Sequence, residues 1–160
     1  RLDEQIRQAI VLLEALWSPK QLDFDADLAE VTWRGPETLM LHVWTNLISN
    51  AVKFSPQRGL IAVTLKQTDG RFEIAITDQG PGIPPEEQER IYRRFYQVDS
   101  SHQQEGNGLG LALCKQILDD CGGIIRVENQ LPCGCRFIVT LPEKMTGEEA
   151  KQEEAHGTGK

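Results

Sequence analysis

Three short blocks in a fixed order constrain this chain more than any other feature of its sequence. They are Asn46-Leu-Ile-Ser-Asn50-Ala-Val-Lys53-Phe54, Asp78-Gln-Gly80-Pro-Gly82 and Gly106-Asn-Gly108-Leu-Gly110-Leu111. Together the blocks offer carboxamide oxygens, one carboxylate and several glycines whose backbone amides no side chain covers. A magnesium nucleotide requires this combination, because carboxamides suit the metal, a carboxylate suits a base amine, and free amides suit phosphates.

The apolar pattern of the chain predicts an α+β fold. Apolar residues at helical spacing predict helices over residues 3–17, 36–54, 84–96 and 108–121. Alternating apolar runs predict strands over residues 22–26, 31–33, 60–65, 72–77, 124–129 and 136–141. These elements predict a two-layer α/β sandwich, in which helices pack on one face of a mixed, mostly antiparallel sheet.

Length and charge limit the class of protein further. We expect one domain over residues 1–142 and a disordered polar tail over residues 143–160. The net charge of -7 argues against a nucleic acid or an anionic membrane as partner. The four cysteines match neither a paired zinc motif nor a disulfide framework, so we expect reduced thiols in the cytosol. Because the chain begins with Arg1, we expect a piece of a longer protein.

The first block lies on the predicted helix over residues 36–54. Four polar side chains recur there at spacings of three and four and so share one face, namely His42, Asn46, Asn50 and Lys53. We assign Asn50 as a ligand of Mg²⁺, because neutral amide oxygens suit this hard cation. Lys53 can neutralise a phosphate as a point charge. A solvated helix face is the alternative interpretation of this block taken alone.

The second block directly follows a predicted strand. By the two-residue period of a strand, Asp78 shares one face with three apolar side chains, Phe72, Ile74 and Ile76. A carboxylate on that face is costly unless it finds a donor, and the exocyclic amine of adenine is such a donor. Gly80 and Gly82 leave room for a flat ring. The alternative is a buried aspartate that caps the turn at Gly80.

The third block ends a polar stretch over residues 97–106, which we expect to be a mobile loop, and opens a helix. Gly106, Gly108 and Gly110 would place free amides at the positive end of the helix dipole, where phosphates bind. The spacing matches neither a P-loop nor the glycine pattern of a dinucleotide-binding βαβ unit. A flexible hinge with a helix cap is the alternative for this block alone.

Taken together, the blocks resemble the catalytic, ATP-binding domain of sensor histidine kinases in the GHKL ATPase superfamily, over residues 1–142. The first block resembles the N box, the second the G1 box, the third the G2 box, and residues 90–96 the F box. The resemblance implies a Bergerat-type sandwich that binds ATP and Mg²⁺. It implies nucleotide contacts by Asn46, Asn50, Lys53, Phe54, Asp78, Gly80, Gly82, Ile83, Phe95, Tyr96, Gly106, Gly108, Leu109, Gly110 and Leu111.

The resemblance also implies a reaction and its partners. Asn46, Asn50 and Lys53 would serve transfer of the γ-phosphoryl group to a histidine on a separate dimerisation and phosphoacceptor domain. A response regulator would act downstream. Without the dimerising helices, this piece is expected to be a monomeric, cytoplasmic part of a parent protein of a kind that is often anchored in the cell membrane.

The sequence departs from the family pattern in three places. None of the three histidines (His42, His102 and His156) precedes an acidic residue on a helix, so the phosphoacceptor segment is absent. Gln97 stands where many members carry an arginine, which leaves His102 as the nearby source of a cation. The usual Gly-Thr-Phe pattern reads Gly134-Cys-Arg136-Phe137, so a hydroxyl contact is missing.

Other functions of this superfamily stay open. A GHKL hydrolase uses a glutamate as general base where this chain has Asn46, which cannot take a proton from water. A nucleotide-sensing module without transfer activity would fit the departures at Gln97 and Cys135. A serine kinase of the anti-sigma type is disfavoured by the F box and by the helix predicted over residues 3–17.

Overall fold

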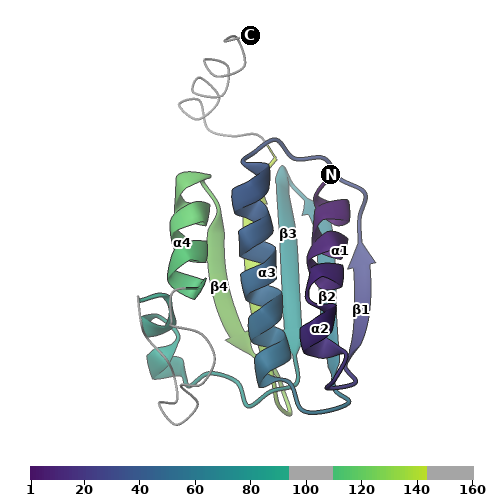
Figure 1. Cartoon of the computed structure of the whole chain (residues 1–160). Coiled ribbons are helices and arrows are strands. Elements are labelled where there is room, and N and C mark those ends of the chain that lie inside the picture. The colour runs from purple at the N-terminus through teal and green to yellow at the C-terminus, as the bar shows by residue number, and fades with distance from the viewer. Residues whose placement is uncertain (94–109, 144–160) are drawn as a thin grey trace, which may run out of the picture.

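The computed structural model describes residues 1–93 and 110–143, which form two layers (Figure 1). One layer is a five-stranded sheet, whose strands in spatial order are β1 (Asp23–Leu28), β2 (Leu60–Thr68), β3 (Arg71–Asp78), β5 (Cys135–Pro142) and β4 (Ile124–Asn129). The helices of the other layer cover a single face of this sheet, as Figure 1 shows. The predicted α+β sandwich is therefore confirmed.

The strand directions also agree with the prediction. β1 runs parallel to β2, whereas β2 with β3, β3 with β5 and β4 with β5 are antiparallel pairs. The hairpin between β2 and β3 turns at Asp69 and Gly70, whose φ angles of 39° and 78° lie in the left-handed region. The sheet is thus mixed and mostly antiparallel, and its hairpin lies where the Asp-Gly pair predicts a turn.

One predicted strand is wrong. Residues 31–33 form no strand, because their polar groups serve other contacts. The carbonyl of Val31 accepts a hydrogen bond from the amide of Leu2 at 3.0 Å, at the start of the first helix. The indole nitrogen of Trp33 donates to the carbonyl of Pro142, the last residue of β5, at 2.9 Å. The β-branched and aromatic residues here tie the N-terminal segment to the fold instead.

The helical layer holds α1 (Leu2–Leu12), α2 (Glu14–Trp17), α3 (Glu37–Phe54) and α4 (Gly110–Asp120). The helix predicted over residues 3–17 is interrupted at Leu13. The carbonyl of Ile10 accepts from the amide of Leu13 at 3.2 Å and from the indole of Trp17 at 2.9 Å. The carbonyl of Ile10 is therefore already engaged and does not accept from the amide of Glu14, the bond that would continue the first helix.

The segment predicted as a helix over residues 84–96 contains two short 3₁₀ turns, η1 (Pro85–Glu87) and η2 (Arg90–Tyr92). Two consecutive prolines, Pro84 and Pro85, begin this segment, where a missing amide is tolerated, and the amide of Glu87 donates to the carbonyl of Pro84 at 2.9 Å. Gln88 ties the turns to the preceding loop by donating from Nε2 to the carbonyl of Ile83 at 3.1 Å. Residues 94–96 lie outside the described residues.

The core lies between α3 and the sheet, and Figure 1 shows α3 crossing the middle of the sheet. One apolar line of α3, with helical spacing, is buried in full: Met40, Val43, Trp44, Leu47 and Ala51. The facing side of β3 is buried too, at Phe72, Ile74 and Ile76. Burial of these faces fixes how α3 and β3 are rotated about their axes. The packing of the core therefore also sets the positions of the polar line of α3 and of the end of β3.

The described part of the chain ends just past β5. The amide of Glu143, the first residue of the predicted tail, donates to the carbonyl of Gly70 at 3.0 Å. Its carboxylate accepts from Nε2 of Gln67 at 2.5 Å. The remainder of the predicted tail lies outside the described residues. Across residues 1–93 and 110–143, no helix is long and apolar enough to cross a membrane.

Candidate functional site

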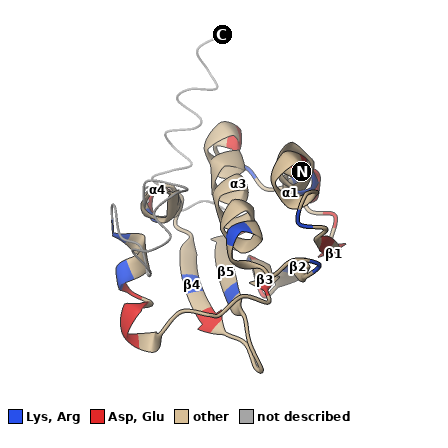
Figure 2. Cartoon of the chain, turned by 60° about the horizontal axis from the view of Figure 1, so that its bottom comes forward, with Lys and Arg blue, Asp and Glu red and all other residues tan. Residues whose placement is uncertain are grey.

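The polar line of α3 borders the core. Asn46, Asn50 and Lys53 are half-buried, while His42 is exposed. Lys53 lies in the last turn of α3, at the end of the helix that comes forward in Figure 2. Its Nζ atom lies 5.4 Å from the centroid of the Phe54 ring. The predicted metal and phosphate residues of this helix therefore follow one line beside the buried face.

Asn46 meets the start of α4. A Cβ atom on Gly110, the first residue of α4, would lie only 3.4 Å from Oδ1 of Asn46. One turn further along α4, burial raises the pKa of the Cys114 thiol to about 12, and a hydrogen bond with the Asn46 side chain opposes this rise. The structure thus brings the first block against the described part of the third block, at a spacing that corresponds to ordinary van der Waals contact.

Asp78 ends β3 inside the fold, with 4% of its surface exposed. The amide of Gly80 donates to its Oδ1 at 2.8 Å, so the turn cap considered from the sequence is present. Burial raises the pKa of Asp78, and hydrogen bonds from the backbone of Gly80 and Cys135 oppose that rise. A carboxylate accepts about four hydrogen bonds, so these two amides leave it able to accept from a further donor.

Gly80 and Gly82 are required by contacts within the protein. A Cβ atom on Gly80 would lie 2.5 Å from the carbonyl oxygen of Phe54, at the end of α3. A Cβ atom on Gly82, whose φ is +81°, would lie 2.8 Å from Oδ1 of Asn129. The sequence attributes the absence of these two side chains to the approach of a flat ring, and the structure adds a second reason, because protein atoms lie where each side chain would stand. Contact of either glycine with a nucleotide through its backbone stays a prediction.

Asn129, at the end of β4, holds the loop after Asp78 in place. Its Oδ1 accepts from the amide of Ile83 at 2.8 Å, and its Nδ2 donates to the carbonyl of Ile83 at 2.8 Å. Gly134, with a φ of +117°, lets the loop between β4 and β5 lie against the carbonyl of Asp78. The sequence gives no local signal for these pairings, because the partners lie far apart along the chain.

Lys20 caps the C-terminal end of α3. Its Nζ donates to the carbonyls of Val52 at 2.6 Å, Lys53 at 3.3 Å and Ser55 at 2.6 Å. A cation at this end also suits the negative end of the helix dipole. The ammonium group therefore fixes the helix end on which Lys53, Phe54 and the Gly80 loop meet. Sequence analysis missed Lys20, because a lone lysine after a proline predicts no such contact.

Several predicted site residues fall outside the described residues. They are Phe95, Tyr96, Gly106, Gly108 and Leu109, together with Gln97 and His102 of the predicted lid. Gly110 and Leu111 are described and are the first two described residues of α4, whereas the predicted helix start at residue 108 lies outside the described residues. Both are half-buried. Gly110 lies next to Asn46, and free amides at the start of this helix stay a prediction.

The residues present fit a magnesium ion that arrives with a nucleotide. Within the described ranges, no group of three or more His, Cys, Asp and Glu side chains is arranged to hold a metal. Asn46 and Asn50 offer neutral amide oxygens along one line of α3 instead. Mg²⁺ commonly takes few ligands from the protein and the rest from phosphates and water. This donor set suits such a shared ion and does not suit a resident metal centre.

Comparison with known proteins gives consistent relatives. MprB of Mycolicibacterium paratuberculosis, described as a signal transduction histidine-protein kinase/phosphatase, is 37% identical over 126 residues, which cover 76% of this chain and 24% of MprB. A solved structure of a mycobacterial MprB superposes with a TM-score of 0.83 at 31% identity, covering 91% of this chain and 97% of that one. Full-length ShkA in complex with AMPPNP superposes with a TM-score of 0.78 at 26% identity, covering 91% of this chain and 31% of ShkA.

The chain spans about a quarter of the length of the curated relatives it matches. The family described as histidine kinase-, DNA gyrase B- and HSP90-like ATPases matches residues 35–145. That range is more than half of the chain, and it contains all three blocks from which the sequence analysis began. On this match, the chain belongs to the family of histidine kinase-, DNA gyrase B- and HSP90-like ATPases, and its relatives are sensor histidine kinases.

Proposed function

We propose that this chain binds Mg-ATP and transfers the γ-phosphoryl group to a histidine on a separate dimerisation and phosphoacceptor domain. One observation carries the proposal: three distant segments converge, since Gly80 packs on the end of α3 and Gly110 packs on Asn46. Around this convergence lie a buried carboxylate on Asp78, two carboxamides and the first amides of α4. Each chemical group of a nucleotide bound there would find a suitable partner in the protein.

Asp78 would bind the adenine base. Its carboxylate accepts hydrogen bonds only, so it would accept from the exocyclic amine of adenine. A guanine base would place a carbonyl oxygen at the same point, and two facing acceptors in a buried site are costly. Burial and the loop held by Asn129 fix the carboxylate in place. We therefore expect this site to favour ATP over GTP.

The phosphates would lie toward Asn50, Lys53 and the start of α4. Lys53 would neutralise phosphate charge, and the amides of Gly110 and Leu111 would donate to phosphate oxygens. Magnesium, held by Asn50, would neutralise charge on the phosphate oxygens when bound. The ShkA structure supports a nucleotide at this fold, because that protein carries AMPPNP.

In the proposed reaction, a histidine nitrogen of the acceptor domain attacks the γ-phosphorus, and the bond to the β-phosphate oxygen breaks to release ADP. Asn46 would orient groups at the phosphates but cannot act as a base toward water, so hydrolysis should be slow. The phosphohistidine would then pass its phosphoryl group to a response regulator. In this account the chain works as a cytoplasmic, monomeric module of a larger protein.

A second candidate is a nucleotide-sensing module without transfer activity. Cys135 lies opposite Asp78 in the ladder between β3 and β5. Burial raises the pKa of its thiol to about 12, with a smaller contribution from the charge of Asp78. A neutral thiol is a weak hydrogen-bond donor, so this position offers less to a bound nucleotide than a hydroxyl would.

One experiment separates these functions. The chain is mixed with Mg-ATP labelled at the γ-phosphate and with a histidine-bearing dimerisation fragment of the parent protein. Acid-labile label on the fragment supports the kinase, bound nucleotide without label supports the sensing module, and rapid phosphate release to water supports a hydrolase. Asn50→Ala should lose transfer, whereas Gln116→Ala, which removes an exposed carboxamide from α4, should keep it.

A further inference from the structure

Lys20 lies in the connection between α2 and β1 and holds the segment that follows α3 from two sides. Its ammonium group donates to carbonyls on both sides of Phe54, at Lys53 and Ser55, at 3.3 and 2.6 Å. Its own backbone carbonyl accepts from the amide of Arg58 at 2.9 Å. One residue therefore restrains both the last turn of α3 and the start of the connection to β2.

Phe54, which lies between two of these carbonyls, supports the turn after Asp78. Its carbonyl oxygen lies against Gly80, where it would stand 2.5 Å from a Cβ atom. The amide of Gly80 in turn donates to Oδ1 of Asp78 at 2.8 Å. A shift at the end of α3 would therefore reach the carboxylate through one backbone contact and one hydrogen bond. Lys20 is the residue that restrains this end.

A second link joins the same segment to the turn. The amide of Leu60, the first residue of β2, donates to Oε1 of Gln79 at 2.9 Å. Leu60 lies two residues past the amide that bonds the backbone carbonyl of Lys20. Gln79 directly follows Asp78. Both residues that come after the carboxylate therefore rest on backbone that Lys20 holds in place.

We propose that Lys20 is a positioning residue for the adenine base, and that it acts through this turn on the carboxylate of Asp78. This inference rests on the proposed function. The ammonium group has three donors, and its three bonds go to backbone carbonyls of the protein, so it would not bind the nucleotide itself. One buried carboxylate would accept from the base amine, and a small displacement of Asp78 would lengthen that bond and lower the preference for adenine.

Gln5 offers a matched control at the other end of α3. Its Nε2 donates to the carbonyl of Glu37, the first residue of α3, at 2.8 Å, and its Oε1 accepts from the indole of Trp44 at 2.9 Å. Gln5→Met removes both bonds and takes this partner from a buried indole, so it should destabilise the fold as Lys20→Met does. These contacts lie in the N-terminal half of α3, away from the turn after Asp78.

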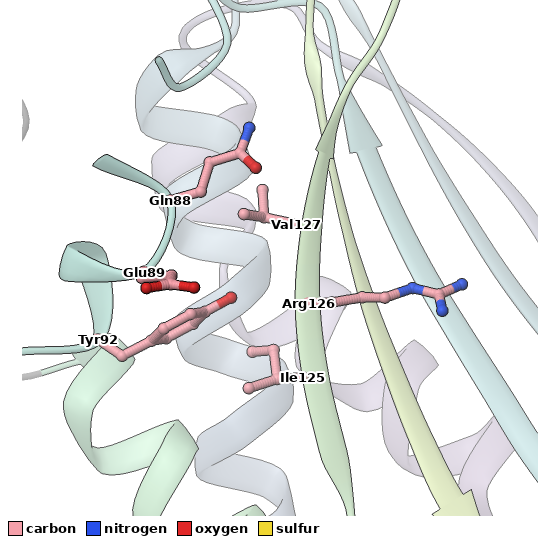
Figure 3. A pocket seen from close by; sticks show the side chains of 6 residues that line it. All are labelled: Gln88, Glu89, Tyr92, Ile125, Arg126 and Val127. Atoms are coloured by element: carbon pink, nitrogen blue, oxygen red, sulfur yellow. The ribbon is translucent and has the colours of Figure 1, made fainter. Parts of the chain in front are cut away.

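A second control concerns the place at which the base binds. A cavity of about 220 Å³ lies between the η1–η2 segment and β4 (Figure 3), where Tyr92 faces Ile125 and Val127. Its described lining includes none of the residues assigned to the nucleotide. Val127→Phe would fill part of this space and leave the contacts of Lys20 intact. A base bound in this cavity would be displaced by Val127→Phe and would not respond to Lys20→Met.

The test measures calorimetric affinity at a temperature at which circular dichroism shows every variant to be folded. The probes are Mg-ATP and the magnesium complex of purine riboside triphosphate, which lacks the amine. Lys20→Met should bind Mg-ATP about five- to tenfold more weakly than the wild type, and its preference for ATP over the second nucleotide should fall by a similar factor. Gln5→Met and Val127→Phe should keep the affinity and the preference of the wild type.

Three results would overturn the assignment of Lys20 and leave the proposed function standing. They are wild-type affinity in Lys20→Met, an equal loss of affinity in Gln5→Met, and a Lys20→Met variant that binds both nucleotides more weakly with its preference for ATP unchanged. Two other results would refute the base site at Asp78, and the assignment of Lys20 with it. These are a wild type without preference between the two nucleotides, and loss of Mg-ATP binding in Val127→Phe but not in Lys20→Met.

Discussion

Replacing Lys20 with methionine should destabilise the fold from the C-terminal end of α3. The ammonium group donates to three carbonyls there, at 2.6, 3.3 and 2.6 Å. Methionine keeps most of the apolar stem and removes only the charged donor. The helix end would therefore lose its cap while the packing around the stem stays close to that of the wild type.

The size of the loss in unfolding free energy depends on how well water can hydrate the carbonyls that Lys20 releases. A hydrogen bond from a charged group contributes about 1.5–3 kcal/mol, and a cation at a helix C-terminus about 0.3–1 kcal/mol. Lys20 is only half-buried, so water can reach part of the released carbonyls. Ser55, however, is 4% exposed, and its carbonyl would be poorly hydrated. We expect Lys20→Met to lower the free energy of unfolding by about 2 kcal/mol, near the low end of the combined range.

Urea unfolding followed by circular dichroism measures this loss. Lys115→Met is the matched control, because Lys115 pairs with Asp119 at 2.9 Å and the two side chains are 45% and 54% exposed. An exposed pair of this kind contributes about 0.3–0.5 kcal/mol. Equal losses in the two variants, or a loss below 0.5 kcal/mol for Lys20→Met, would refute the assignment of Lys20 as the cap.

Four further changes test other parts of the site. Because burial raises the pKa of Asp78 above 3.8, the folded state holds the carboxyl proton more tightly than the unfolded state does, and the free energy of unfolding should fall as pH rises from 3.8 through the raised pKa. Urea unfolding of Asp78→Asn should lack this fall. A pH profile of Asp78→Asn equal to that of the wild type would contradict the prediction. Gly134→Ala places a methyl group against the carbonyl of Asp78 at a φ of +117°, so thermal melting should show a loss of about 2–4 kcal/mol, and an unchanged melting temperature would count against the packing described. Asn129→Ala removes both bonds to Ile83, so calorimetry should show weaker ATP binding with little loss of secondary structure, whereas wild-type affinity would remove its positioning role. Asn50→Ala should weaken binding of Mg-ATP and leave metal-free ATP unaffected, which a magnesium titration checks, and equal loss in both states would exclude Asn50 as a ligand.

The sequence predicts those features that depend on local periodicity. The spacing of Met40, Val43, Trp44 and Leu47 predicts the buried face of α3, and with it the polar line that carries Asn46 and Asn50. Strand alternation likewise predicts that Asp78 points inward. Both predictions succeed because each element buries one face, and the period of the helix or strand then fixes the direction of its remaining side chains.

The features that sequence analysis missed depend on contacts between distant segments. Lys20 reaches the end of α3, and Asn129 reaches Ile83, through hydrogen bonds that no local pattern announces. One reason for Gly80 was missed as well, because the carbonyl of Phe54, which is distant in sequence, excludes a side chain there. Val31 and Trp33 show the same effect on secondary structure, since their tertiary hydrogen bonds override a local preference for strand.

The central proposal is that the Asp78 carboxylate binds the amine of adenine near the end of α3 and the start of α4. Its most direct test is the affinity of the wild type and Asp78→Asn for Mg-ATP and for the triphosphate of purine riboside, which lacks the amine. The account predicts that the wild type prefers ATP by roughly tenfold or more, and that Asp78→Asn loses this preference. Equal affinity of the wild type for the two nucleotides, or an undiminished preference in Asp78→Asn, would contradict it.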